Sequence, residues 1–333
     1  YMLADPYIPI KFQNEYGQGA NGIYSEKAVT SWGPRFDGSE VKHWSNDPNY
    51  IANQLNGDDT YPYVAQPDNI KDFFQTGRSL ATNLSVNVNS GTSNTFFSYT
   101  HTDATGIVEG NNLQGHNLSI RTTSSLSDRL KLDSRLNYIR QNFDNVMFTG
   151  ESFNNPMRYL YQIPRNIRTV DLQHHQFVNA AGQTRQHFYS PGFNGAGNPY
   201  WTRNNVLNPQ LEERLLGMLS LNYQITNDLS ILGRSALDRT NTVSETKLAN
   251  DTYVTANNGS YARNNSNSFE WNTDVLLNYH NDLSPAFTLD LNVGANNRIF
   301  KSDALGASGV NFQIENLFAL GNTQDPRPID NFY

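Results

Sequence analysis

The stretch LKLDSRLNY, residues 130–138, decides the fold class of this chain. Apolar and polar residues alternate along it. Because successive side chains of a β-strand point to opposite faces, this period of two predicts a strand with one apolar face and one hydrated face. The apolar positions are Leu130, Leu132, Leu136 and Tyr138, and the polar positions are Lys131, Asp133, Arg135 and Asn137.

Seven further segments alternate in the same way, and we predict a strand for each: residues 80–89, 95–103, 115–124, 213–225, 229–241, 268–280 and 287–298. In all eight strands the mid-strand charges fall on the polar face: Arg121, Lys131, Asp133, Arg135, Arg234, Glu270, Asp274 and Asp290. Five other charges break the alternation at strand ends that meet longer connections: Arg78, Asp103, Arg140, Glu213 and Arg239. We expect rim positions for these five.

The connections between the predicted strands alternate in length. Short ones (residues 90–94, 125–129, 226–228 and 281–286) take turns with long ones (104–114, 141–212 and 242–267). Short periplasmic turns at one end and long extracellular loops at the other are typical of an antiparallel transmembrane β-barrel. We therefore predict an all-β fold that holds about 8 to 10 strands of such a barrel.

Composition agrees with this class. Of the 333 residues, 17% are charged and 37% are hydrophobic, and the mean hydropathy is -0.62. No apolar run approaches the roughly 18 to 20 residues that a membrane-spanning helix needs, but barrel strands present only alternate residues to lipid. The net charge of -7 argues against a nucleic-acid partner. The chain has no cysteine, which excludes disulfides and thiolate metal sites.

The main structural alternative is a soluble β-sandwich, whose strands also alternate between a core face and a wet face. Two features favour the barrel. The predicted strands of about 10 to 13 residues are close to the roughly 9 to 11 that cross a bilayer with tilt. Aromatic residues also flank both ends of the apolar face, as in the girdles of membrane barrels: Phe97, Tyr223, Tyr279 and Phe287 near the short turns, and Tyr138, Phe269 and Trp271 near the long loops.

Order-specific motifs run along most of the chain: FQNEYGQG (12–19), SWGP (31–34), FFQTG (73–77), FSYT (97–100), GIV (106–108), NPYW (198–201) and LSLNY (219–223). Together they resemble the SusC/RagA family of TonB-dependent outer-membrane transporters. Residues 1–333 would then be part of the barrel domain, with residues 141–212 as a long extracellular loop. The TonB box, the plug and the C-terminal strands of the family lie outside this sequence, so we expect a fragment.

The resemblance implies several partners and a location. These are a SusD-like surface lipoprotein that covers the barrel, TonB–ExbB–ExbD acting through the missing N-terminal part, and the lipid of the outer membrane of a Gram-negative, Bacteroidetes-type bacterium. The implied activity is import of oligosaccharides or peptides, with the polar-face charges meeting the plug. The alternative is a surface glycan-binding or adhesin-like protein that does not transport. A glycan-active enzyme is a third reading, but the sequence shows no catalytic constellation, and we expect no enzyme.

The segment 141–212 is far longer than an ordinary connection, and such loops are usually functional or disordered. Its aromatic residues argue for order, and residues 155–162 are expected to form a short helix. Aromatic rings stack on sugars and also pack on partner proteins. We predict contact with substrate or lid for Tyr159, Tyr161, Tyr189, Tyr200 and Trp201, with residues 24–63 nearby. The alternative is that these aromatics only pack the loops against each other.

Two other motifs favour simpler interpretations. GQGANG, residues 17–22, matches the GxGxxG pattern, but no amphipathic helix follows, so we predict a glycine turn at the external end rather than a dinucleotide site. His174, His175 and His187 have no supporting metal-binding spacing, and we expect ordinary loop histidines there. No cofactor and no metal is expected.

Overall fold

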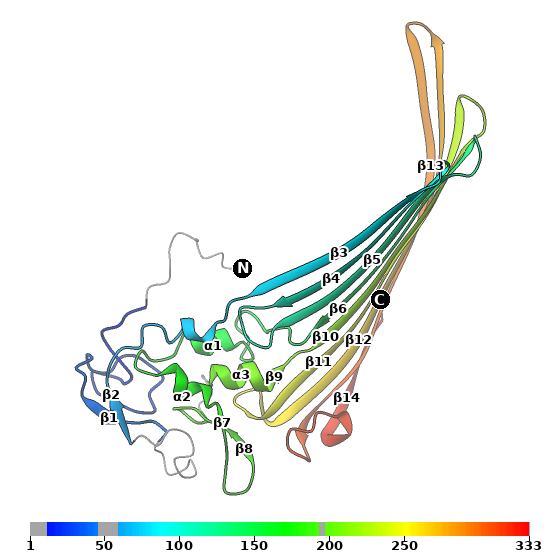
Figure 1. Ribbon diagram of the computed structural model, residues 1–333. Coiled ribbons are helices and arrows are strands. Elements are labelled where there is room, and N and C mark those ends of the chain that lie inside the picture. The colour runs from blue at the N-terminus through cyan, green and yellow to red at the C-terminus, as the bar shows by residue number, and fades with distance from the viewer. Residues whose placement is uncertain (1–11, 46–58, 193–196, 333) are drawn as a thin grey trace.

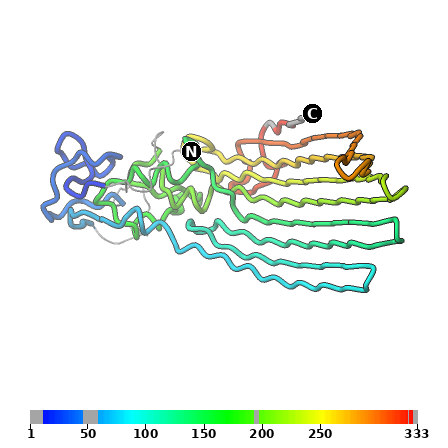
Figure 2. The backbone as a smooth tube through the Cα atoms, turned by 90° about the horizontal axis from the view of Figure 1, so that it is seen from above, coloured from blue at the N-terminus to red at the C-terminus, as the bar shows by residue number. Residues whose placement is uncertain are grey.

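The computed structural model describes residues 12–45, 59–192 and 197–332. Its main feature is a ten-stranded antiparallel sheet with the strand order β14-β13-β12-β11-β10-β6-β5-β4-β3, in which the short β9 also pairs with β11 (Figures 1 and 2). The strands are β3 (Arg78–Asn89), β4 (Ser93–Thr105), β5 (Asn112–Ser125), β6 (Leu130–Phe143), β9 (Val206–Leu207), β10 (Gln210–Gln224), β11 (Leu229–Thr252), β12 (Ala256–Ser284), β13 (Phe287–Phe312) and β14 (Thr323–Phe332). The predicted all-β antiparallel class is confirmed, as one arc of a barrel-like domain.

Short turns join the strands at one end of the sheet, and the helices and longer connections gather at the other (Figure 1). Each of the eight predicted strands is present. Strands that are distant in sequence also lie side by side. β6 pairs directly with β10, although the 66-residue segment 144–209 separates them. That segment therefore leaves and re-enters the sheet at adjacent strands.

Two predictions about the strand ends are wrong. Residues 242–267 were expected to form a long loop, but β11 and β12 continue as a paired hairpin to Thr252 and Ala256. The prediction relied on apolar residues alternating with polar ones, and here Asn, Ser and Thr occupy both faces. The few apolar residues of this hairpin, such as Leu248 and Ala256, pack against Val206 at its end instead of forming a stripe along it, so the alternation vanishes while the strands persist.

The last predicted strand was expected to end at Arg298, but β13 runs on to Phe312 and β14 follows it. β14 contains Pro326 and Pro328, and proline is uncommon within a sheet. They are tolerated because β14 is the edge strand of the described sheet, where a missing backbone N–H need not break a ladder on both sides.

The buried core of the described residues lies mainly outside the sheet, in the connections at its long-loop end. There the segment 144–209 forms α1 (Pro156–Leu160), α2 (Thr169–Gln173), the β7–β8 hairpin (Gln176–Val178 and Thr184–Gln186) and α3 (Pro199–Asn205). The earlier part of the chain adds β1 (Glu40–Lys42), β2 (Thr60–Pro62) and η1 (Lys71–Phe73), and η2 (Leu320–Asn322) precedes β14. We call the following buried set the loop core: Trp44, Ile70, Phe73, Val108, Tyr159, Leu160, Ile163, Ile167, Leu172, Phe188, Tyr189, Tyr200 and Tyr253.

Local sequence explains where the helices of the loop core begin. Asn155 caps α1 by accepting a hydrogen bond from the Met157 amide, and proline occupies the first turn. Asn198 and Pro199 repeat this arrangement at α3. The short helix predicted near residues 155–162 is therefore confirmed, although it ends at Leu160.

The glycine motif at residues 17–22 forms a tight turn region, as predicted. A Cβ on Gly17 would lie 2.5 Å from the ring of Phe36 and 2.6 Å from the hydroxyl of Tyr63, so this position has no room for a side chain. Gly22 has a φ of 77°, in the left-handed region that favours glycine. The Gln18 amide, between these glycines, donates to Asn166 Oδ1 at 2.6 Å and so attaches the motif to the loop core.

Candidate functional site

The polar face of the sheet carries several ion pairs. Residues paired directly across an antiparallel ladder share a face, so the register can be followed from strand to strand. All eight predicted polar-face charges fall on one face. The pairs that connect them are Arg121–Arg135, Asp133–Ser220, Ser220–Arg234, Arg234–Asp274, Asp238–Glu270, Lys131–Asn222 and His280–Asp290.

Seven of these eight charges lie within about 3.2 Å of an ionisable partner, and among the described residues Lys131 is the exception. Asp133 Oδ2 forms ion pairs with the guanidinium groups of Arg121, at 3.1 Å, and Arg135, at 3.2 Å. Arg234 donates to Asp274 at 3.0 Å on the neighbouring strands. Each pair remains partly exposed to solvent, so it is worth roughly 0 to 1 kcal/mol and serves mainly to keep a charged surface neutral and hydrated.

Sequence reasoning missed three members of this surface. Arg214 lies 2.6 Å from Asp238, and Arg298 lies 2.7 Å from Glu270. Arg214, Asp238 and Arg298 all lie on the same face of the sheet as Arg234 and Glu270, so the alternation of two faces along each strand could have identified them. Arg214 and Arg298 lie at the ends of the predicted strands 213–225 and 287–298, whereas the polar-face assignment covered mid-strand charges.

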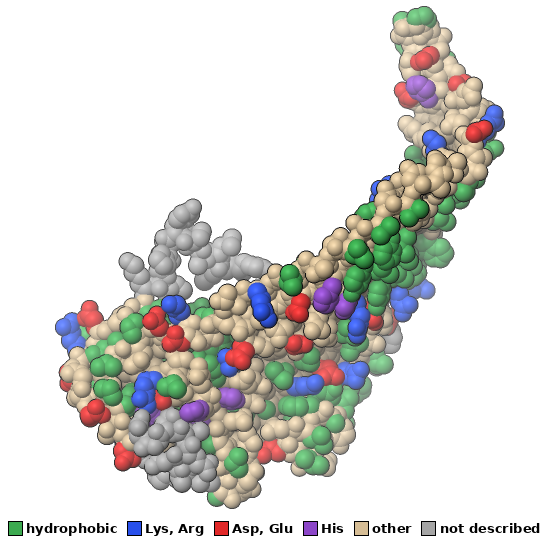
Figure 3. Space-filling model, in the orientation of Figure 1, with side chains coloured by type: hydrophobic (Ala, Val, Ile, Leu, Met, Phe, Trp, Pro, Cys, Tyr) green, Lys and Arg blue, Asp and Glu red, His purple; other side chains and the backbone are tan. Residues whose placement is uncertain are grey.

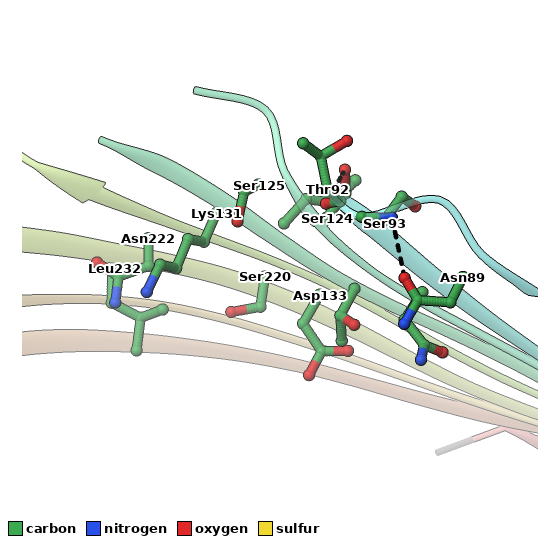
Figure 4. A pocket seen from close by; sticks show the side chains of 14 residues that line it. Asn89, Thr92, Ser93, Ser124, Ser125, Lys131, Asp133, Ser220, Asn222 and Leu232 are labelled. Carbon is green, nitrogen blue, oxygen red and sulfur yellow. Dashed lines mark hydrogen bonds between the residues drawn. The ribbon is translucent and has the colours of Figure 1, made fainter. Parts of the chain in front are cut away.

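Two hollows lie on this polar face. One, of about 440 Å³, is near the short turns and is lined by polar side chains that include Lys131, Asp133, Ser220 and Asn222 (Figure 4). The other, of about 590 Å³, lies further along the same strands. Its floor is partly apolar, because Phe96, Leu216, Met218 and Ala236 interrupt the polar face there, with Arg121, Arg135 and Asp238 beside them. The sequence pattern did not predict this apolar patch.

The opposite face is apolar and exposed. One row of directly paired residues crosses eight strands without a polar side chain: Val86, Phe97, Ile120, Leu136, Gly217, Leu237, Trp271 and Ile299. Val86 is 49% exposed, Leu136 is 44% exposed and Trp271 is 46% exposed. Figure 3 shows hydrophobic side chains gathered over the strands. The next row on this face holds Ser134, Ser235 and Thr273 around Leu219, so the apolar surface is a band across the strands rather than the whole face. An exposed apolar band of this extent marks a face that meets lipid or protein rather than water.

The structure corrects the predicted substrate or lid contacts. Tyr159, Tyr189, Tyr200 and Trp201 are 4%, 2%, 1% and 1% exposed. These four rings fill the interior of the loops because aromatic side chains are the main apolar material that the loops offer, so they are not available to a ligand. Tyr161 alone among the five is accessible, at 49%, and its contact with substrate or lid stays a prediction.

A buried polar cluster joins residues 12–45 to the loop core. His43 Nε2 lies 3.0 Å from Asp171 Oδ2, and Arg168 donates to the same carboxylate from Nε at 2.7 Å. Burial raises the pKa of Asp171, but the hydrogen bonds from His43 and Arg168 outweigh it and leave this pKa below its ordinary value. The cluster therefore holds a buried carboxylate in its ionised form.

The loop histidines do not form a metal site in the part of the chain that the structure describes. His187 is buried, stacks near Trp44 with 4.5 Å between ring centroids, and lies with Nδ1 2.7 Å from the His174 carbonyl oxygen. Burial lowers the pKa of His187 to about 4, which keeps the ring neutral at physiological pH.

Within the described residues, no helix has the length and apolarity to cross a membrane. The fold itself has solved counterparts. Chains from structures of the RagAB peptide importer in its "closed-closed" and "open-open" states, and of the RagAB peptide transporter, superpose with TM-scores of 0.60, 0.61 and 0.60. The chain has the fold of part of this importer.

The likeness is one of fold. Sequence identities are 15%, 14% and 14%, and 80% of this chain aligns with about 30% of each RagAB chain. No family model matches the sequence. No curated protein matches it either. The chain thus spans less than a third of the RagAB chains, and the activity of a whole protein is a matter for proposal.

Proposed function

We propose that this chain is part of the barrel of a TonB-dependent outer-membrane importer that takes up oligosaccharides or peptides and works with a SusD-like surface lipoprotein. The observation that carries this proposal is the sheet with two unlike faces. One face carries exposed apolar side chains across eight neighbouring strands, and the other is lined with hydrated ion pairs. The likeness to RagAB chains supports the same conclusion.

The physical chemistry of a bilayer explains why such a sheet belongs in a closed barrel. Inside lipid every backbone N–H and C=O must be paired within the protein, and a closed barrel leaves no open edge. The described arc ends at two edge strands, β3 and β14. Both edges would pair with further strands of the complete protein.

The polar face would line the interior and meet a mobile plug. Charges that are already paired across strands, such as Arg234 with Asp274, can exchange partners with a plug or with water at little cost in free energy. A plug held by a densely packed apolar interface would need far more work to displace. Force supplied through TonB–ExbB–ExbD would therefore act on a surface suited to sliding.

The loop core would support the external mouth, and the lid would rest on its exposed residues. Trp32 is 73% exposed, Ile23 is 70% exposed and Tyr161 is 49% exposed. These side chains, rather than the buried aromatics, are the candidates for contact with a SusD-like lipoprotein. Aromatic residues that protrude from an ordered surface are common anchors at protein interfaces.

Fractionation and uptake in cells that carry the full-length gene test the proposal. We expect the protein in the outer membrane of a Bacteroidetes-type cell, and we expect deletion of either the gene or TonB to abolish uptake of the same nutrient. The alternative function, a surface glycan-binding or adhesin-like protein, predicts surface binding that is lost with the gene while uptake continues. We propose no enzymatic activity, so the purified protein should leave the nutrient chemically unchanged.

A further inference from the structure

A cavity of about 340 Å³ lies at the long-loop end of the sheet, between the β7–β8 hairpin and the ends of β11, β12 and β13. Its lining is unusual in composition. Seven of its ten residues are amides, which include Asn250, Asn257, Asn311, Gln313 and Gln324. None of the residues predicted from the sequence as candidate contacts lies in it. We call it the amide pocket.

Several of these amides keep hydrogen-bonding capacity for a ligand. The side chains of Asn257, Gln313 and Gln324 are exposed and make no hydrogen bond to the described residues. Each carries an acceptor oxygen and a two-proton donor, so each can serve either role. The pocket therefore offers both hydrogen-bond donors and hydrogen-bond acceptors to a ligand.

The pocket offers no net charge. Its two charged residues, Arg185 and Glu315, form an ion pair with each other, and Glu315 also accepts a hydrogen bond from the Thr184 amide at 3.3 Å. A ligand with a free carboxylate or ammonium group would have to break this pair to find a partner. An uncharged ligand would leave it intact.

The pocket wall is held in a fixed shape. Asn250 and Asn316 exchange two hydrogen bonds, with each backbone N–H donating to the other's side-chain oxygen at 2.8 and 3.1 Å. Four of the five non-glycine residues with positive φ in the described chain belong to the strand ends and turns at this end of the sheet, and one of them, Asn311, lines the pocket: Asp251, Val254, Asn311 and Asn316. Val254, a β-branched residue, has a φ of 71°. Asn and Asp adopt this conformation readily, so Val254 is the strained position, and strain of this kind persists only where the surrounding structure enforces it.

The pocket also lies at the end of the polar face of the sheet. Asn250 follows Arg234 along β11 at an even spacing, without an irregularity in the pairing between them, so both side chains belong to the polar face. Phe312 adds one aromatic ring to the lining. A ligand held here would lie above the ion-paired surface, at its long-loop end.

We propose that the amide pocket binds a neutral sugar residue of an incoming oligosaccharide. The inference rests on the proposed importer and assigns its substrate class. Vicinal hydroxyls donate and accept at once, as amides do, and an aromatic ring packs on the C–H face of a pyranose. A peptide is the less suitable ligand, because its charged termini would find only a pair already satisfied, and the lining amides are side chains rather than an open strand edge.

Binding by the purified full-length protein tests this assignment. The probes are a printed array of neutral oligosaccharides of four to eight glucose, galactose, mannose or xylose residues, and, separately, a tryptic digest of casein. The test variant is Asn257→Ala/Gln313→Ala, which removes no hydrogen bond within the described structure. The control is Asn227→Ala, an exposed amide in the turn between β10 and β11 at the other end of the sheet.

We expect at least one neutral oligosaccharide to bind, at least tenfold more weakly to the double variant, and within twofold of the native affinity to the control. Binding of casein peptides instead, equal binding by the double variant, or no sugar bound at all would each overturn the assignment. Uptake by cells is measured separately. Pocket-dependent sugar binding without uptake would overturn the importer while leaving the pocket's ligand established.

Discussion

Arg234 on β11 and Asp274 on β12 are directly paired on neighbouring strands, and Arg234 Nε lies 3.0 Å from Asp274 Oδ2. The pair is partly exposed, so its loss by Arg234→Ala should change the free energy of unfolding by no more than about 1 kcal/mol. Charge reversal is different, because Arg234→Asp places two carboxylates opposite each other on the face that is proposed to meet the plug. We expect Arg234→Asp to reduce uptake by the full-length transporter severalfold, and the swap Arg234→Asp/Asp274→Arg to restore it.

The matched control for that experiment is Arg35→Asp, which reverses another exposed ion pair, with Glu15, at 2.7 Å, in the external part of the chain. It should leave uptake at the native level. Unchanged uptake in Arg234→Asp, with normal amounts of protein in the membrane, would contradict a role for the polar face in plug movement.

A second prediction concerns the two faces of β10. Leu219 lies on the apolar face and is 48% exposed, whereas the adjacent Met218 lies on the polar face opposite Arg135. If the apolar face meets lipid, Leu219→Arg should destabilise the folded barrel by about 2 to 4 kcal/mol, since a cation near the bilayer midplane is costly. Met218→Arg should cost much less, because water reaches that face. Urea unfolding of the full-length protein in lipid vesicles measures both, and equal costs would argue against a lipid-facing surface.

A third prediction separates buried from exposed aromatics in the segment 144–209. Tyr200 is 1% exposed and packs edge to face on Phe73 with 5.1 Å between ring centroids, while Tyr161 is 49% exposed. Tyr200→Ala should destabilise the loop core by about 3 to 5 kcal/mol, by analogy with other large-to-small changes in a core. Tyr161→Ala should cost under about 0.5 kcal/mol. Limited proteolysis should cleave the first variant quickly within residues 144–209 and the second at the native rate.

These faces and loops also show what the sequence could predict. The period of two in residues 130–138 correctly separates Asp133 from Leu132, and the register then places Arg121 and Arg234 on the same face as Asp133. The pattern works there because one face must be apolar. It fails at residues 242–267 because Asn, Ser and Thr fill most positions on both faces of that hairpin, so hydrophobicity no longer alternates along the strand.

The candidate contacts failed for a different reason. Tyr200 and Trp201 are residue types that are common on sugar-binding surfaces, but whether they are buried depends on how segments distant in sequence pack together. Trp201 Nε1 donates to Thr252 on β11 at 3.1 Å, a contact across 51 positions that no local pattern encodes. The amide pocket was missed likewise, because Gln183, Asn250 and Gln313 come from three separate segments.

The last prediction concerns pH. Burial raises the pKa of Asp251 to about 6, although a hydrogen bond from the Gln186 amide, at 2.6 Å, acts in the opposite direction. A carboxyl group whose pKa is higher in the folded state than in the unfolded state stabilises the fold below the unfolded value of 3.8, and this contribution is lost as pH rises through about 6. Local stability around Gln186 should therefore decrease between pH 5 and pH 7.

In the variant Asp251→Asn this decrease should disappear. The asparagine side-chain oxygen can still accept the hydrogen bond from the Gln186 amide, and a φ of 66° suits asparagine. Hydrogen-exchange protection factors of the Gln186 amide, corrected for the intrinsic exchange rate at each pH, measure the effect. A native protein whose protection stays constant over this range would show that Asp251 is already ionised at pH 5.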